Sequence, residues 1–263
     1  MAIDRQKFIE AITCFYRNAR NITLTQVDLD WVNHDGWESE IYAFTVVPDS
    51  PAIQQSMVLR LLTGASAETA RDEFETLSRL HRAGYPVPEV VALGGAEDGF
   101  DAPFIIMQRI EGGNFSGRFP RSPGENIEGL RAFVSLFVQL HSLDVPSVWG
   151  EPDPVVATGS PFVHFDREMA FYHTQLEKSK IDAFSAYLGW LADQRDRARC
   201  ERSSIIHRDF HPDNILEDAD GKAYVIDWTS AEISDYRFDL AWTLTLALAY
   251  RGADIRQLSL IHI

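Results

Sequence analysis

The sequence has few cysteines and a deficit of basic residues, and both shortages exclude classes of protein. Among its 263 residues only Cys14 and Cys200 are cysteines, far apart and outside any Cys-x-x-Cys spacing, so neither a disulfide framework nor a zinc site is indicated. Lysine and arginine number 24 against 39 aspartates and glutamates, which gives a net charge of −15. Nucleic-acid binding requires a basic face, so we expect no nucleic-acid partner, whereas a cationic small molecule is compatible with this charge.

The sequence also lacks long apolar stretches. Its start, MAIDRQKFIEAITCFY, has no apolar segment of the kind found in secretory signals, and no apolar run is long enough to span a bilayer. We therefore expect a cytoplasmic protein without a membrane partner. A hydrophobic content of 45% over this length is sufficient for one large domain or two lobes with a well-buried core.

The first part of the chain reads as strands with two helices. Apolar residues at helical spacing predict a helix over residues 4–20, and Ser66 and Gly84 are the expected cap and end of a second helix. Alternating or β-branched segments predict strands at 25–32, 39–47, 55–62, 88–93 and 102–110.

The second part of the chain reads mainly as helix. A connector rich in Gly, Pro and Ser, EGGNFSGRFPRSPGEN, precedes helical stretches at 127–143, 166–199 and from 238 onward. The change of character predicts two lobes, 1–111 and 112–263.

One segment, IIHRDFHPDNILEDADGKAYVIDW, carries the oxygens that phosphoryl transfer requires. Asp209 and Asn214 have the H-R-D-x-x-x-x-N spacing of a kinase catalytic loop. A hairpin turn at Asp220–Gly221 is expected to return the chain so that the following strand ends on Asp227, beside Asn214. Asp209 would then receive the proton of the attacking hydroxyl, and Asn214 and Asp227 would bind magnesium.

These residues, followed by VIDWTSAEISDYRFDLAW, resemble the aminoglycoside phosphotransferase/choline-kinase-like family of small-molecule kinases. The resemblance implies an α+β, bilobal protein-kinase-like fold with an N-terminal antiparallel sheet plus helix and a mostly helical C-terminal lobe. It also implies Mg²⁺ and ATP or GTP as cofactors, Asp209 as the catalytic residue, and Asn214 and Asp227 as metal ligands. Asp239, in the downstream D-L-A, is expected to accept hydrogen bonds from the catalytic-loop backbone.

An arginine–glutamate pair is expected in the first lobe. Arg60 occupies the position at which this family places a strand cation that touches the α- and β-phosphates, unless it is merely an exposed strand end. Of the glutamates on the next helix, Glu73 lies on the apolar stripe with Ala70 and Leu77, whereas Glu75 is turned away. A glutamate that faces the core requires a cation, so Glu73 is the expected partner of Arg60.

Two further nucleotide contacts follow from the resemblance. NHDGWESEIYAF occupies the phosphate-loop position, with Gly36 and Ser39 as candidate contacts, although it has one glycine where relatives often have two, and a simple strand turn fits equally well. FIIMQRIEG resembles the family hinge, where backbone groups near Gln108 and Ile110 would pair with the purine edge.

Spacing opposes a protein kinase, because Asp227 leads within a dozen residues to DYRFDLAW, with no D-F-G and no A-P-E. Arg208 is therefore expected to be structural. A small hydroxylated acceptor is favoured, in a pocket between Asp209 and the helical segment 150–200. Aminoglycosides, macrolides, choline or ethanolamine, homoserine and sugars all remain open, as does a kinase-fold protein that binds a nucleotide or metabolite without turnover.

The end of the chain carries a separate expectation. LSLIHI is also the in-frame translation of a transposon-end sequencing adapter, and members of the family usually continue with more helices. We expect the natural chain to run on past about Gln257, the alternative being a short family member with an apolar tail.

Overall fold

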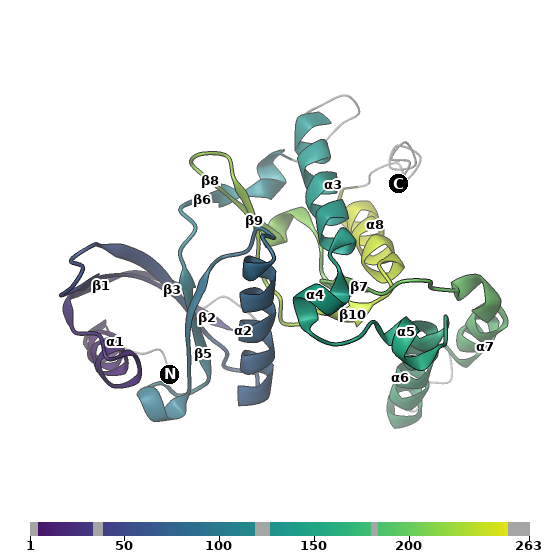
Figure 1. The fold of residues 1–263 in the computed structure, drawn as a ribbon, viewed down its shortest axis with the longest axis horizontal. Coiled ribbons are helices and arrows are strands. Elements are labelled where there is room, and N and C mark those ends of the chain that lie inside the picture. Colours follow the sequence, from purple (N-terminus) through teal and green to yellow (C-terminus); the bar gives the residue numbers. More distant parts are fainter. Residues whose placement is uncertain (1–4, 34–38, 119–126, 180–183, 252–263) are drawn as a thin grey trace. The chain divides into compact units, whose positions relative to one another are not determined.

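The computed structural model describes residues 5–33, 39–118, 127–179 and 184–251 (Figure 1). They form two compact units: the described residues up to Gly117 together with Pro212–Ser230, and those of Arg118–His211 together with the part from Ala231 onward. The division into two lobes at 111/112 stays a prediction. The contacts group Pro212–Ser230, which that division places in the second lobe, with the first unit. Gly36 and the last twelve residues, 252–263, lie outside the described residues, and with them the expectations made there.

A five-stranded antiparallel sheet organises the first unit, in the order β1-β2-β3-β5-β4. The predicted strands and the two predicted helices are confirmed, with ends that shift by a few residues. The elements are α1 (Arg5–Arg20), β1 (Leu24–Asn33), β2 (Glu40–Pro48), β3 (Gln55–Leu61), α2 (Ala67–Arg82), β4 (Val90–Gly94), the short 3-10 helix η1 (Ala96–Asp98) and β5 (Phe104–Gln108).

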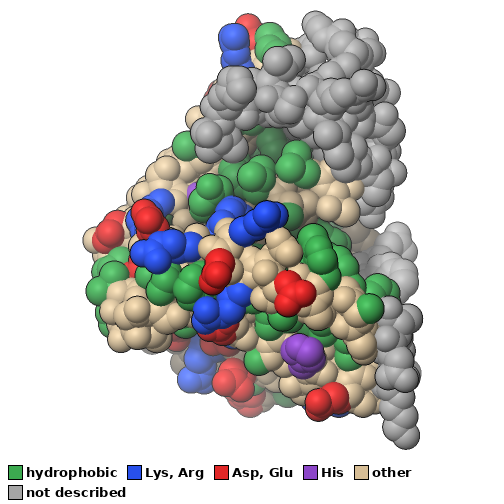
Figure 2. Space-filling model, turned by 90° about the vertical axis from the view of Figure 1, so that its right-hand side faces the viewer, with side chains coloured by type: hydrophobic (Ala, Val, Ile, Leu, Met, Phe, Trp, Pro, Cys, Tyr) green, Lys and Arg blue, Asp and Glu red, His purple; other side chains and the backbone are tan. Residues whose placement is uncertain are grey.

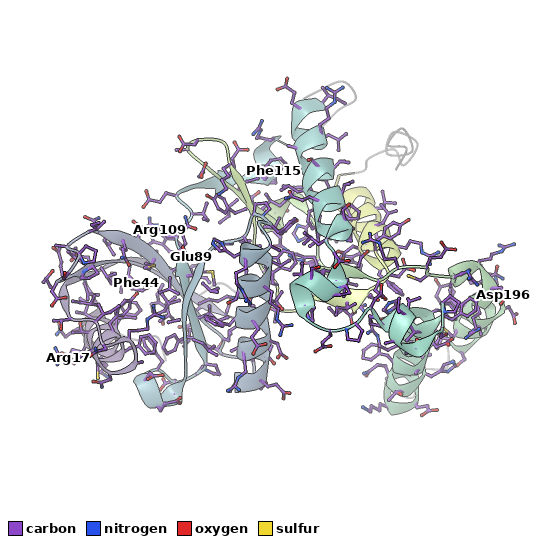
Figure 3. All side chains as sticks on the ribbon, viewed as in Figure 1. Arg17, Phe44, Glu89, Arg109, Phe115 and Asp196 are labelled. Atoms are coloured by element: carbon purple, nitrogen blue, oxygen red, sulfur yellow. The ribbon has the colours of Figure 1, made fainter. Side chains whose placement is uncertain are left out.

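Alternation along the strands divides the sheet between two apolar clusters. On β5, Phe104 and Ile106 belong to the cluster that also contains the buried residues of α1, whereas Ile105 belongs to the cluster of α2. Side chains fill the space between α1 and the sheet, Phe44 among them (Figure 3). Leu59 and Leu61, the neighbours of Arg60 on β3, belong to the α1 cluster. Since successive strand residues point to opposite faces, Arg60 lies on the α2 face of the sheet.

Helix α2 confirms the predicted cap and helix phase. The hydroxyl of Ser66 accepts a hydrogen bond from the backbone N–H of Thr69, the contact expected of an N-cap. Glu73 is 2% exposed, on the same buried stripe as Ala70 and Leu77, whereas Glu75 is solvent-accessible and pairs with Arg79 one turn later.

A small second sheet completes the first unit, in the order β6-β8-β9, from β6 (Gly112–Asn114), β8 (Ile215–Asp218) and β9 (Ala223–Val225). The sequence predicted a connector at 112–114, and this was wrong because a three-residue strand is too short to show alternation. A Cβ at Gly112 would lie 1.8 Å from the carbonyl oxygen of Glu217, so the close approach of β6 to β8 requires glycine there. The 3-10 helices η2 (Phe115–Arg118) and η5 (Pro212–Asn214) flank these strands.

The second unit is mainly helical, as predicted. Its helices are α3 (Ile127–Ser142), α4 (Val145–Trp149), α5 (Pro154–Thr158), α6 (Val163–Ser179), α7 (Ser185–Asp193), the short η4 (Arg195–Ala198) and α8 (Arg237–Arg251). The two strands β7 (Ser204–Ile206) and β10 (Glu232–Ser234) pair antiparallel. No helix in the described ranges combines the length and the apolar character that a membrane crossing requires.

One face of the molecule exposes hydrophobic side chains between acidic and basic ones (Figure 2). Several large aromatic side chains of α6 and α7 are about half exposed, including Phe171, Tyr187 and Trp190. Because charges of both signs are interspersed on this face, it does not present a field of a single sign.

A buried polar cluster lies inside the second unit. Ser203 donates its hydroxyl proton to Asp153 at 2.6 Å, so the Nε2–H of His164 must be the donor in the 2.7 Å contact with that hydroxyl. His164 is 1% exposed, and its Nδ1 has no hydrogen-bond partner among the described residues. Burial, with a further contribution from Arg167, lowers the pKa of His164 below its ordinary value of 6.5.

This cluster predicts a pH dependence of stability. Below pH 6.5, His164 binds a proton in the unfolded chain more readily than in the folded chain, because folding lowers its pKa. We therefore expect the free energy of unfolding to fall as the pH drops, by at most about 1.4 kcal/mol per pH unit. Above that pH the residue is neutral in both states and contributes no slope. Urea unfolding between pH 5 and 8 measures the effect on the wild type and on His164→Gln. His173→Gln, a change at an exposed position of the same helix, is the control and should keep the wild-type slope. Parallel curves for the wild type and His164→Gln would contradict the assignment.

Candidate active site

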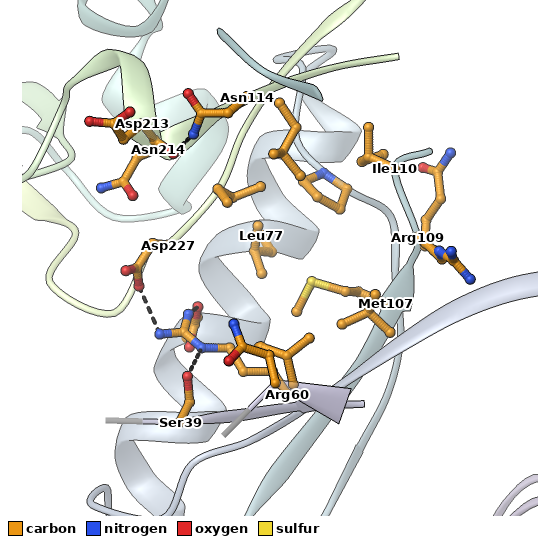
Figure 4. Close-up of a pocket in the computed structure, with 18 of the residues that line it drawn as sticks. Ser39, Arg60, Leu77, Met107, Arg109, Ile110, Asn114, Asp213, Asn214 and Asp227 are labelled. Carbon is orange, nitrogen blue, oxygen red and sulfur yellow. Dashed lines mark hydrogen bonds and ion pairs between the residues drawn. The ribbon is translucent and has the colours of Figure 1, made fainter. Parts of the chain in front are cut away.

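A cavity of about 460 Å³ opens within the first unit, a volume typical of small-ligand sites (Figure 4). Apolar side chains form one part of its wall, including Val58 of β3, Met107 of β5, Leu77 of α2 and Ile226, which follows β9. The cavity brings together most of the site residues predicted from the sequence: Ser39, Arg60, Glu73, Gln108, Ile110, Asn214 and Asp227.

Arg60 is the polar centre of the cavity. Its guanidinium bonds Glu73 at 2.5 Å and Asp227 at 2.8 Å, and its Nε donates to the hydroxyl of Ser39 at 3.2 Å (Figure 4). The predicted ion pair between Arg60 and Glu73 is confirmed, and the alternative of an exposed strand end is wrong, since Arg60 is 9% exposed. The bond to Asp227 was not predicted, because it joins residues 167 positions apart in the chain.

Glu73 occupies the most desolvated position of this group. Burial raises the pKa of its carboxyl above the ordinary value, Arg60 lowers it, and Asp227 raises it again. An ion pair of this kind stabilises a fold only while both partners are present, because removal of one leaves the other buried without compensation.

A matched pair of substitutions tests the role of this pair. We expect Glu73→Gln to weaken nucleotide binding about tenfold and to lower stability by ~3 kcal/mol, because Arg60 loses the charge that orients it. Glu75→Gln should change neither quantity, because the Glu75 side chain is 49% exposed and its surface pair with Arg79 is worth less than about 1 kcal/mol. Calorimetric titration with nucleotide and thermal unfolding are the measurements, and equal behaviour of the two variants would refute the assignment.

The two predicted metal ligands flank the hairpin β8–β9, since Asn214 immediately precedes β8 and Asp227 follows β9 by two residues. The backbone N–H of Ile226 donates to the carbonyl of Asn214 at 2.9 Å, so the start of β8 and the end of β9 lie side by side. The sequence placed Asp227 on the strand end; instead β9 ends at Val225, and Asp227 follows with φ of +66°. Trp228 fixes this turn, since it is 1% exposed and its indole donates to the carbonyl of Val225 at 3.0 Å.

This donor set fits magnesium. Mg²⁺ prefers oxygen ligands and takes one or two from the protein, with water and phosphate oxygens completing its shell. Asn214 supplies an amide oxygen, and the Asp227 side chain is 44% exposed, so its carboxylate is open to the cavity. The described residues contain no group of three or more His, Cys, Asp or Glu side chains that could hold a metal alone.

Other cavity residues were missed by the sequence reasoning. Arg109 bonds Asp30 at 2.5 Å and lies 5.9 Å from the centre of the Trp31 ring. The side-chain amide of Asn114 donates to the carbonyl of Asp213 at 2.9 Å, which ties β6 to η5. The Gly-Gly-Asn of the supposed connector was the available signal for this contact.

Asp209 belongs to the second unit, on the loop after β7. The predicted role of Asp239 toward this loop is confirmed, because its carboxylate accepts hydrogen bonds from the backbone N–H groups of His207 and Arg208, both at 2.7 Å. Asp239 is fully buried and also lies 3.0 Å from Nε2 of His141. The loop before the predicted catalytic residue is therefore fixed by a buried carboxylate.

The Arg208 side chain has structural partners, as predicted. Its guanidinium contacts Glu168 of α6 and Glu232 of β10, and it lies 5.6 Å from the centre of the Phe238 ring. Arg208 has φ of +71°, a conformation that costs a residue other than glycine ~1–2 kcal/mol. The two carboxylates hold the side chain of a residue whose backbone is strained, next to Asp209.

Comparison with known proteins identifies the family to which the chain is similar. The chain matches the phosphotransferase enzyme family, APH, over residues 32–259. It is 27% identical over 195 residues to acyl-CoA dehydrogenase family member 10 of Mus musculus, a match that covers 70% of this chain. The chain spans only 17% of the length of that relative.

Two solved structures show the fold. A candidate aminoglycoside phosphotransferase of Ralstonia eutropha JMP134 aligns with a TM-score of 0.64 at 19% identity, covering 92% of this chain and 70% of that one. APH(2")-IIIa, in a complex with GDP and kanamycin, aligns with a TM-score of 0.56 at 17% identity, covering 95% and 85%. The predicted α+β, protein-kinase-like fold is confirmed. Because residues 32–259 make up most of the chain, the protein belongs to the phosphotransferase enzyme family.

Proposed function

We propose that the protein transfers a phosphoryl group from ATP or GTP, with magnesium, to a hydroxyl of a small molecule. The observation that carries this proposal is the cavity of the first unit, in which Arg60, paired with Glu73, faces the same space as Asn214 and Asp227. A cation held by a buried carboxylate next to two oxygen donors is suited to a magnesium–triphosphate complex.

The cavity suggests how the nucleotide is bound. The base would lie against the apolar wall near Met107 and Ile110, with hydrogen bonds to the hinge backbone, and the phosphates would reach Arg60. An arginine fork suits phosphate oxygens and stays protonated. We propose that Ser39, which accepts a bond from Arg60, keeps the guanidinium in place for this contact.

Magnesium would supply charge neutralisation between the phosphates, and Asn214 and Asp227 would hold it. A metal at this site would compete with Arg60 for the Asp227 carboxylate, since one of its oxygens is bonded to Arg60 at 2.8 Å. We propose that the phosphates take over this arginine when the metal nucleotide binds.

Asp209 is proposed to receive the proton of the acceptor hydroxyl. It precedes Asn214 by five residues, so chain connectivity keeps their Cα atoms within about 18 Å. A base must come within hydrogen-bond reach of the hydroxyl that it activates.

The acceptor is proposed to be a small hydroxylated molecule. APH(2")-IIIa, which shares the fold, has been solved with kanamycin and GDP, a hydroxylated amine and a nucleotide. The net charge of −15 is also compatible with a cationic acceptor. ATP and GTP are available in the cytoplasm, where we propose that the reaction occurs.

One screen tests the proposal and its alternative. Product formation is measured over a panel of aminoglycosides, macrolides, amino alcohols and sugars, with ATP or GTP, and with magnesium or EDTA. We expect a phosphorylated product that EDTA abolishes. Binding of metal nucleotide without any product would favour the alternative, a kinase-fold protein that binds a nucleotide or metabolite without turnover.

A further inference from the structure

One face of helix α8 contacts the loop that carries Asp209. Asp239, Trp242 and Thr243 are spaced i, i+3 and i+4, so they lie on the same side of the helix. The hydroxyl of Thr243 donates to the carbonyl of Phe210 at 2.7 Å, on the far side of Asp209 from the backbone groups that Asp239 binds. The loop is thus held by the helix on both sides of Asp209.

Trp242 contacts the carboxylate itself. Its indole Nε1 donates to Oδ1 of Asp209 at 2.9 Å, while Nε2 of His211 lies 3.3 Å from Oδ2. Tryptophan has a single donor and no acceptor, so this hydrogen bond uses its whole polar capacity. Hydrogen bonds to an ionised carboxylate are stronger than those between neutral groups.

We propose that Trp242 is a positioning residue for the phosphoryl transfer and also selects its acceptor. The inference rests on the proposed function, in which Asp209 receives the acceptor proton. An aspartate side chain can rotate about two bonds, and the indole N–H restrains both by fixing one carboxylate oxygen. The fixed carboxylate then presents a defined direction to the incoming hydroxyl.

The exposed ring of Trp242 is the basis of its proposed role in acceptor selection. Trp242 is 45% exposed although its N–H is bonded, so its aromatic surface borders the carboxylate and remains open. An acceptor hydroxyl within about 3 Å of Asp209 would bring the neighbouring carbon atoms against this ring. The acceptor should therefore present an apolar C–H face beside its reactive hydroxyl, as the ring of a cyclic molecule does.

Two substitutions separate the roles. Trp242→Phe keeps a ring and loses the N–H, so we expect kcat to fall about tenfold with KM unchanged. Trp242→Leu loses both, so KM should rise as well. Trp149→Phe, the same change on α4 of the same unit, is the control and should leave both constants at their wild-type values. An unchanged kcat in Trp242→Phe would overturn the positioning role, and an unchanged KM in Trp242→Leu would overturn acceptor selection.

A second measurement does not depend on turnover. The ¹H–¹⁵N indole resonance of Trp242, assigned by its loss in Trp242→Phe, should move when Asp209 is replaced in Asp209→Ala, while that of Trp149 stays. A Trp242 resonance that does not respond would refute the inference whether or not an acceptor is found. A wild-type protein that phosphorylates no member of the panel, but shows the shift, would contradict the proposed function alone. Melting temperatures of all variants check that they fold.

Discussion

Asp209→Asn is expected to abolish phosphoryl transfer while nucleotide binding survives. The amide cannot accept the proton of the attacking hydroxyl, and general-base catalysis typically contributes about 10²–10⁴-fold to rate. The residue acts on the acceptor and not on the triphosphate, so nucleotide affinity should remain. The substitution keeps the side-chain shape and an oxygen for the bond from the Trp242 indole, so the loop should keep its fold.

Turnover is measured on the acceptor found by the screen, and nucleotide affinity by calorimetry in the same buffer. Asp101→Asn, the same chemical change at an exposed position, is the control and should leave both quantities unchanged. Turnover of Asp209→Asn close to that of the wild type would exclude Asp209 as the base. Loss of nucleotide affinity in this variant would instead indicate a role toward the metal.

Asp227→Asn is expected to remove the magnesium-dependent part of nucleotide binding. The side chain loses the charge that attracts the metal, and a change from carboxylate to amide at a ligand typically removes several kcal/mol of charge interaction at close range. Without magnesium, affinity should remain or even rise, because Asp227 no longer holds Arg60 away from the phosphates.

Titrations with ATP in magnesium and in EDTA distinguish these effects. The wild type should show a large difference between the two conditions, and the variant should show none. Asp220→Asn, at the exposed turn of the same hairpin, is the matched control and should keep the difference. A magnesium effect of wild-type size in Asp227→Asn would contradict the metal assignment.

Local pattern sufficed for the longer helices and strands and for part of the site. Helix periodicity alone separated Glu73 from Glu75, because a helix repeats every 3.6 residues and its buried stripe can be read directly. Strand alternation likewise placed the main sheet, and spacing within one short segment related Asp209, Asn214 and Asp227. The helix phase and the strands are confirmed because they depend on residues close in sequence, whereas the joint role of Asp209, Asn214 and Asp227 stays a prediction.

Contacts between distant segments were decided only by the tertiary structure. The bond of Arg60 to Asp227, the clamp of Glu168 and Glu232 on Arg208, and the indole of Trp242 on Asp209 each join separate elements. No local periodicity encodes such partners, because they depend on strand register and on how helices pack.

The short strands and the strained backbone were also beyond local pattern. Strands β6, β7 and β10 have three residues each, too few for alternation to distinguish them from loops. The positive φ of Arg208 and of Asp227 contradicts local preference, which disfavours that conformation for residues other than glycine. Sequence therefore determined the parts and the chemistry they carry, while tertiary contacts determined how these two residues are held, since only such contacts offset the local strain.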